Sequence, residues 1–231
     1  MDPRLDHTLD WPRDSPTQLR LQLMPERAAF EPESRTLFVA DVHLGRAAVF
    51  RARGLPVPQG TTTGTLARLS QALDRCQARH LVVLGDFLHA KESHASSTLA
   101  ALSNWRQRHP HLHCLVIEGN HDLHAGQVQA SFSIQSITGP YVHGCLRGVH
   151  HPPEQQGDQA KDTLTLAGHV HPVVHLRSRT DRLRLPIFWL HQGVLTLPAF
   201  GEFTGGFAIN PAAQRDGEVF VVGEQVLPLA G

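Results

Sequence analysis

Short apolar runs recur along the chain, and longer polar segments separate them. Four of these runs are typical of buried strands: 37–40, 81–84, 115–117 and 164–167. Between the first two, Leu66, Leu69 and Leu73 recur at helical spacing and predict a helix over residues 64–79. A second helix is expected over about 95–108. Strands that alternate with helices in this way predict a parallel sheet with crossover helices.

Both ends of the chain are richer in strands. Leu19, Leu21 and Leu23 alternate with polar residues and predict a half-buried strand, which a hairpin joins to the strand ending at Ala40. After residue 163 strand-like runs follow one another, at 164–167, 173–176, 187–190, 194–197, 206–209 and 218–222. We therefore expect an α/β fold in which two sheets have helices on the outside, a four-layer α/β/β/α sandwich.

The length of 231 residues and a hydrophobic content of 41% suit a single domain with a sizeable core. We place this domain at residues 18–231. Residues 1–17 contain three prolines and are expected to form a flexible leader, and residues 152–162 to form a surface loop.

Polar clusters follow the strand-like runs in a fixed order along the chain. They are Asp41-Val42-His43, Gly85-Asp86, Gly119-Asn120-His121-Asp122, His150-His151 and Gly168-His169-Val170-His171. In α/β sheets, ligands gather outside the carboxyl ends of strands, so these side chains are expected to meet at one edge. Five such clusters in series predict a metal site, whereas a single cluster of this kind occurs often by chance.

The spacing within the clusters suggests how the side chains point. Asp41 and His43 are two residues apart, as are His169 and His171, so in extended geometry each pair would face one side. The mixture of oxygen and nitrogen donors suits Mn, Fe or Zn better than Ca. Seven candidate ligands exceed the need of one ion and would serve two ions with a bridging carboxylate.

This motif set resembles that of the calcineurin-like metallophosphoesterases over about residues 36–171. The resemblance implies that Asp41, His43, Asp86 and His171 hold one ion. It implies that Asp86, Asn120, His150 and His169 hold the second ion, with Asp86 as the bridge. It further implies that a metal-bridged hydroxide attacks phosphorus, that His121 protonates the leaving oxygen, and that Asp122 orients His121.

A narrower resemblance extends over about residues 19–222. Five segments are similar to the bacterial DNA-ligase-associated metallophosphoesterases: 40–46, 54–58, 85–89, 184–186 and 197–206. This resemblance implies a manganese-dependent phosphodiesterase and DNA endonuclease that acts in repair and is linked to a DNA ligase and a helicase. Fe, Zn or Co could occupy the same ligands.

Composition adds limits to this reading. The 21 basic and 21 acidic residues cancel, which argues against binding mainly through a broad basic surface. Bound metal ions would add positive charge that this count omits. Three scattered cysteines fit a reducing, cytoplasmic compartment, and no segment is long and apolar enough to span a membrane.

Several alternatives stay open at this point. His150 and His151 compete for one ligand position, with His150 favoured because it lies nearer the strand end. His89 could line the cleft or serve only in packing, and Arg46 could contact a substrate phosphate or be a solvated charge. A small-nucleotide phosphodiesterase or a phosphomonoesterase would use the same metal core, and a metal-free scaffold would lack ligands that this chain has.

Overall fold

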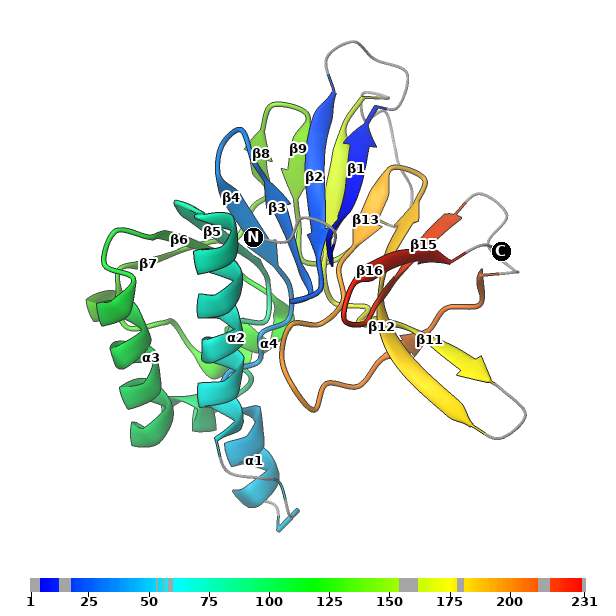
Figure 1. Ribbon diagram of the computed structural model, residues 1–231. Coiled ribbons are helices and arrows are strands. Elements are labelled where there is room, and N and C mark those ends of the chain that lie inside the picture. Colours follow the sequence, from blue (N-terminus) through cyan, green and yellow to red (C-terminus); the bar gives the residue numbers. More distant parts are fainter. Residues whose placement is uncertain are drawn as a thin grey trace.

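Seven strands form the first sheet in the order in which they follow one another along the chain (Figure 1). The computed structural model describes residues 5–12, 18–52, 54–55, 57, 60–153, 162–177, 181–211 and 217–229. The first four strands pair antiparallel, and the last four pair parallel. They are β1 (His7–Trp11), β2 (Leu19–Met24), β3 (Ala28–Glu31), β4 (Thr36–Val39), β5 (His80–Leu84), β6 (His113–Ile117) and β7 (Ile134–Ile137).

The N-terminus differs from the sequence-based expectation. The flexible leader predicted over residues 1–17 is wrong for residues 7–11, which form β1 and pair antiparallel with β2. Leu9 is buried, because it packs between the sheets, and Asp6 ion-pairs with Arg75 of the helix α2 (Thr61–Cys76). Residues 1–4 and 13–17 of the predicted leader lie outside the described residues.

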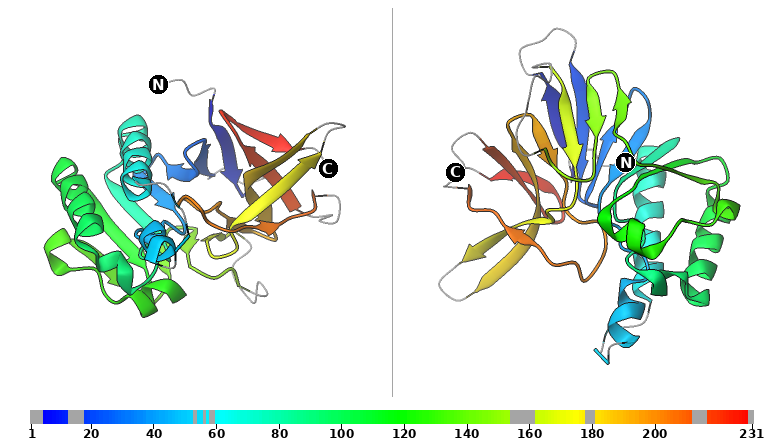
Figure 2. Two further views of the ribbon diagram at one scale, coloured as in Figure 1. Left: turned by 90° about the horizontal axis from the view of Figure 1, so that it is seen from below. Right: turned by 180° about the vertical axis from the view of Figure 1, so that it is seen from behind.

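The described helices all lie between β4 and β7 in the sequence, and those that contact the first sheet pack on one of its faces (Figures 1 and 2). Besides α2 they are α1 (Arg46–Ala52), α3 (Ser96–Arg108) and α4 (Asn120–Ala125), with 3₁₀ turns at Lys91–His94 and Ala130–Phe132. The two predicted helices are thus confirmed as α2 and α3. No helix among the described residues is long and apolar enough to cross a membrane.

A nine-stranded second sheet packs against the opposite face of the first. In β4, Leu37 and Val39 face the helices, while Phe38 faces the second sheet, as the two-residue period of a strand requires. The strands are β8 (Tyr141–His143), β9 (Leu146–Gly148), β10 (Leu164–Ala167), β11 (Pro172–Arg177), β12 (Arg182–His191), β13 (Val194–Thr196), β14 (Phe207–Ala208), β15 (Gly217–Val222) and β16 (Val226–Leu229).

The α/β class, the two sheets and the single domain are confirmed. The outer side of the second sheet carries no helix in the described part of the chain. A small apolar cluster lies there instead, around Val174, Ile187 and Val219 of β11, β12 and β15. Residues 154–161 of the predicted surface loop, and Pro56 and Pro58 of the segment 54–58, lie outside the described residues.

The two sheets meet at the carboxyl ends of their parallel strands. Ala40, directly after β4, forms a parallel bridge with Ala199, and its carbonyl accepts a hydrogen bond from the Phe200 amide at 2.8 Å. In the second sheet β9, β10 and β13 are parallel to one another. This arrangement places the segments that follow β4, β5, β6, β9 and β10 around one point.

Candidate metal centre

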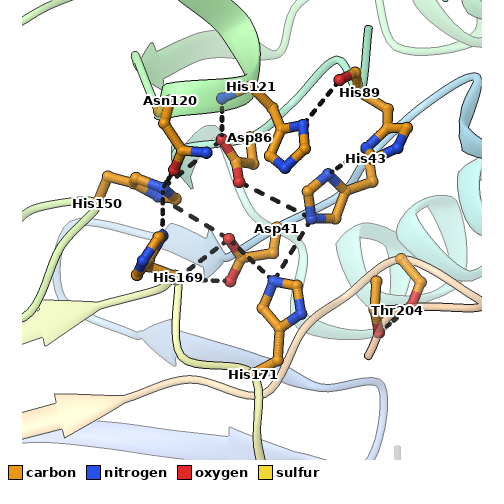
Figure 3. A network of polar contacts seen from close by, with 12 residues as sticks. Asp41, His43, Asp86, His89, Asn120, His121, His150, His169, His171 and Thr204 are labelled. Carbon is orange, nitrogen blue, oxygen red and sulfur yellow. Dashed lines mark hydrogen bonds and ion pairs between the residues drawn. The ribbon is translucent and has the colours of Figure 1, made fainter. Parts of the chain in front are cut away.

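All seven predicted metal ligands converge where these segments meet (Figure 3). Five turns supply them, each directly after a strand. They are Asp41 and His43 after β4, Asp86 after β5, Asn120 after β6, His150 after β9, and His169 and His171 after β10. The clusters that the sequence separates by up to 130 residues therefore form one group.

The backbone at the site is left-handed rather than extended. Asp41 and His43 have φ of 54° and 49°, and His169 and His171 have φ of 67° and 51°. The extended geometry expected for these two pairs is therefore wrong. Asp and His tolerate this region better than branched residues do, and such conformations concentrate at functional sites.

A first group of donors consists of Asp41, His43 and His171. The Nε2 atoms of the two histidines lie 3.4 Å apart, and His171 Nε2 lies 3.4 Å from Asp41 Oδ1. Ligands of one tetrahedral ion, each about 2.1 Å from it, lie about 3.4 Å apart. The three side chains could therefore hold one ion with little movement.

A second group surrounds His150. Its Nδ1 donates to the Leu84 carbonyl at 3.0 Å, and burial lowers the pKa of His150 to about 4, so the neutral ring has a lone pair on Nε2. That lone pair faces the Asn120 Oδ1 at 3.0 Å and the His169 Nδ1 at 3.3 Å. Two acceptor atoms repel each other at such distances unless a cation lies between them. The donor atoms of His150, Asn120 and His169 therefore fit a shared cation.

Asp86 lies between the two groups. One carboxyl oxygen is 3.8 Å from His43 Nε2, and the other is 3.6 Å from His150 Nε2. Asp41 and Asp86 are 0% and 2% exposed, and burial raises the pKa of Asp86. Buried carboxylates beside neutral imidazoles lack a compensating positive charge, and divalent cations would supply it. The residues therefore fit a metal centre.

Burial also keeps histidines of the site in the form that binds metal. It lowers the pKa of His43 well below its usual range and lowers the pKa of His169. A neutral imidazole presents a lone pair to a metal ion, whereas the protonated ring does not.

His121 lies beside these two groups and forms a further possible ligand set with His43 and His89. Its Nδ1 donates to the His89 carbonyl at 2.8 Å, and its backbone amide donates to Asp86 Oδ1 at 2.9 Å. The ring stacks on that of His89 with centroids 4.6 Å apart and meets the His43 ring edge-on at 4.9 Å. The hydrogen bonds of the described residues leave its Nε2 unoccupied.

The resemblance implies that Asp122 orients His121, and the structure shows which groups its carboxylate contacts. Its carboxylate accepts hydrogen bonds from the backbone amides of Phe87, Leu88 and Gly119, at 3.2, 2.8 and 3.0 Å. Burial raises the pKa of Asp122 to about 6. It therefore ties the turn after β5 to the turn after β6, while the His89 carbonyl orients His121.

His150 and His151 both lie near His169, and the three histidines form one possible ligand set. His150 is 4% exposed and reaches Asn120, whereas His151 is exposed and packs its ring 4.0 Å from that of His169. Sequence reasoning missed Ser93, whose buried hydroxyl donates to the Leu44 carbonyl and accepts from the His89 amide. Nothing in its local sequence marks this role, because both partners are loop backbone.

Comparison with known proteins finds relatives over nearly the whole chain. The family model for calcineurin-like phosphoesterases matches residues 34–221. The crystal structure of the Pseudomonas putida nuclease MPE has a TM-score of 0.81 and 39% identity, with 97% of this chain and 100% of that chain covered. Yfce, a phosphoesterase from E. coli, has a TM-score of 0.42 and 15% identity, with 81% of this chain and 87% of that chain covered. A search of curated protein sequences found no match.

Proposed function

Because the chain belongs to the calcineurin-like phosphoesterase family of metal-dependent hydrolases, we propose that it is a binuclear phosphodiesterase that cleaves DNA. The observation that carries the proposal is the convergence of seven O and N donors beside His121, whose Nδ1 donates to the His89 carbonyl. The nuclease MPE, at 39% identity over nearly the full chain, supports a nucleic-acid substrate. The narrower resemblance extends the proposal to manganese and to a setting in DNA repair.

In this proposal Asp41, His43, Asp86 and His171 hold one ion. Asp86, Asn120, His150 and His169 hold the other, and Asp86 bridges them. When bound, two divalent cations would neutralise charge on the phosphoryl oxygens and lower the pKa of a water at the site. They would also change two buried negative charges into a net charge of plus two, which attracts a phosphodiester although the whole chain is neutral.

His121 delivers a proton to the leaving oxygen in this proposal. Its Nδ1 proton is held by the His89 carbonyl, so the proton that it transfers is the one on Nε2. Asp122 supports this step indirectly, since it fixes the turns that carry Asp86 and His121.

Cleavage of a single-stranded DNA circle in the presence of manganese tests the proposal, because a circle has no end for an exonuclease. We expect linear fragments, and faster hydrolysis of a bis-aryl phosphate diester than of the aryl monoester. H121Q should retain bound metal yet lose most turnover, and H111Q, an exposed histidine at the opposite edge of the sheet, should retain both.

The alternatives predict different results in the same assays. Faster hydrolysis of the monoester would indicate a phosphomonoesterase. Cleavage of dinucleotides with intact circles would indicate a small-nucleotide phosphodiesterase. A protein that binds no manganese and hydrolyses none of these substrates would refute the enzymatic proposal.

A further inference from the structure

A small pocket beside His43, with an empty volume of about 240 Å³, contains residues that have no part in the metal centre. Arg46 and Ala47 of α1 form one wall. Thr61, Thr62 and Thr65 of α2 form the next, and Glu202 and Phe203 form the third. Because His43 itself lines the pocket, any group bound there would lie next to the reaction centre.

Arg46 is the charged group of this pocket, and its surroundings are unusual. Its guanidinium lies over the Phe50 ring, 5.2 Å from the centroid, and its buried Nε has no hydrogen-bond partner among the described residues. Arg68 and Arg75, also partly buried, donate to carboxylates of Glu202, Asp6 and Glu26. No such carboxylate pairs with Arg46 among the described residues.

The position of Arg46 is set by the fold rather than by a salt bridge. Gly45, directly before it, has φ of 81°, and a Cβ there would lie 2.6 Å from the Ser93 Cα. This close packing fixes the turn that leads from His43 into α1. Burial lowers the pKa of Arg46, and the nearby Asp86 carboxylate counteracts that effect, so the charge is close to the metal centre.

An anion is the ligand that these groups fit. A planar guanidinium donates to phosphate oxygens in a fixed geometry, and the half-buried hydroxyls of Thr61 and Thr62 are further donors. Glu202, which lines the same pocket, contacts Arg68 at 3.5 Å and does not pair with Arg46 among the described residues. The pocket is too small to enclose a nucleotide, so it suits a group that is part of a longer chain and lies across its mouth.

We propose that Arg46, with the hydroxyls of Thr61 and Thr62, binds the phosphate next to the scissile one and thereby favours polynucleotides over simple diesters. This inference rests on the proposed phosphodiesterase function. Phe203, 50% exposed on the third wall, would border the nucleoside that joins the two phosphates.

Matched substrates that differ only in the second phosphate test the inference. One pair is the p-nitrophenyl ester of thymidine 5′-phosphate, with and without a 3′-phosphate. The other is the p-nitrophenyl ester of thymidine 3′-phosphate, with and without a 5′-phosphate. For one of the two strand polarities we expect the second phosphate to raise kcat/KM by roughly 10-fold to 100-fold, the size of one charge-assisted contact.

R46Q should abolish this preference. The matched control R108Q removes the same charge from the exposed end of α3, at the opposite edge of the sheet, and should retain the preference. R46K keeps the charge but not the planar donors and should retain part of it. The salt dependence of kcat/KM for the doubly phosphorylated substrate should also weaken in R46Q, by about one phosphate contact.

Three results would overturn the inference. The second phosphate could have no effect in either polarity, R46Q could slow all four compounds equally, or R46K could retain the full preference. If R46Q does not fold, the preference measured for R46K tests the inference in its place. Failure of the proposed function would look different, because the wild-type protein would then hydrolyse none of the four compounds, and both proposals would fall.

Discussion

Gly85 is the residue on which the second donor group depends most directly, and G85A is therefore the sharpest test of the site geometry. Gly85 has φ of 79°, and a Cβ there would lie 2.0 Å from His150 Nδ1. Ordinary contact begins at 3.4 Å, so the ring would have to move by about 1.4 Å. This movement would break the hydrogen bond from Nδ1 to the Leu84 carbonyl.

Two costs add in G85A. An L-residue in the left-handed region costs about 1–2 kcal/mol, and a buried donor that loses its partner costs roughly 1–3 kcal/mol. We expect the free energy of unfolding to fall by about 2–5 kcal/mol. Metal ligands must keep their distances to within about 0.2 Å, so we also expect the protein to bind one equivalent of manganese instead of two.

The measurements are urea unfolding with a chelator present and metal content after dialysis. G144A is the matched control: Gly144 has φ of 56°, and its Cβ would meet nothing within 4 Å. It should show only the cost of the left-handed backbone and retain both metal ions. The reasoning would be refuted if G85A matched G144A in stability and in metal content.

Three further predictions concern stability. In metal-free protein, burial lowers the pKa of His150 to about 4, below the unfolded value of about 6.5, so the unfolded state binds more protons in between. Stability should fall by about 2–3 kcal/mol from pH 7 to 4.5 in urea titrations, and H150Q should reduce this loss. D122N should lower the free energy of unfolding by about 2–4 kcal/mol, since it replaces a charged acceptor of three amides. A free energy of unfolding within about 0.5 kcal/mol of the wild-type value would contradict this. R75A should lower the free energy of unfolding by about 2–4 kcal/mol, because it leaves Asp6 and Glu26 unpaired. It should also speed hydrogen exchange in β1, and unchanged exchange would contradict a stabilising contact between Arg75 and the N-terminal strand.

The parallel part of the fold could be predicted because its signals are local. Runs of apolar residues mark β4, β5, β6 and β10, and the leucine spacing marks α2. The strand β1 was missed, because its only apolar residues, Leu9 and Trp11, are separated by Asp10 and form no apolar run. Its pairing with β2, the burial of Leu9 between the sheets and the bond from Arg75 to Asp6 hold it in place.

The absence of a helical layer on the second sheet, within the described residues, also has a physical explanation. Alternate residues of β12 and β15 are apolar on both faces: Phe188 and Phe220 pack toward the first sheet, and Ile187 and Val219 pack on the other side. Periodicity alone shows that both faces are covered. It does not tell whether a helix or folded strands provide the cover.

The sequence by itself determined which donors this protein has and that they meet. Each cluster follows a strand, and parallel strands end at one edge of a sheet, so their order along the chain was enough to predict one site. Only the tertiary structure decided how each donor is used. In the structure His150 is buried and His151 is exposed. The Asp122 carboxylate accepts hydrogen bonds from three backbone amides, and the His89 carbonyl accepts one from the His121 ring. The reason is that a side chain's direction depends on its own backbone angles and on partners that lie tens of residues away, and the local sequence specifies neither.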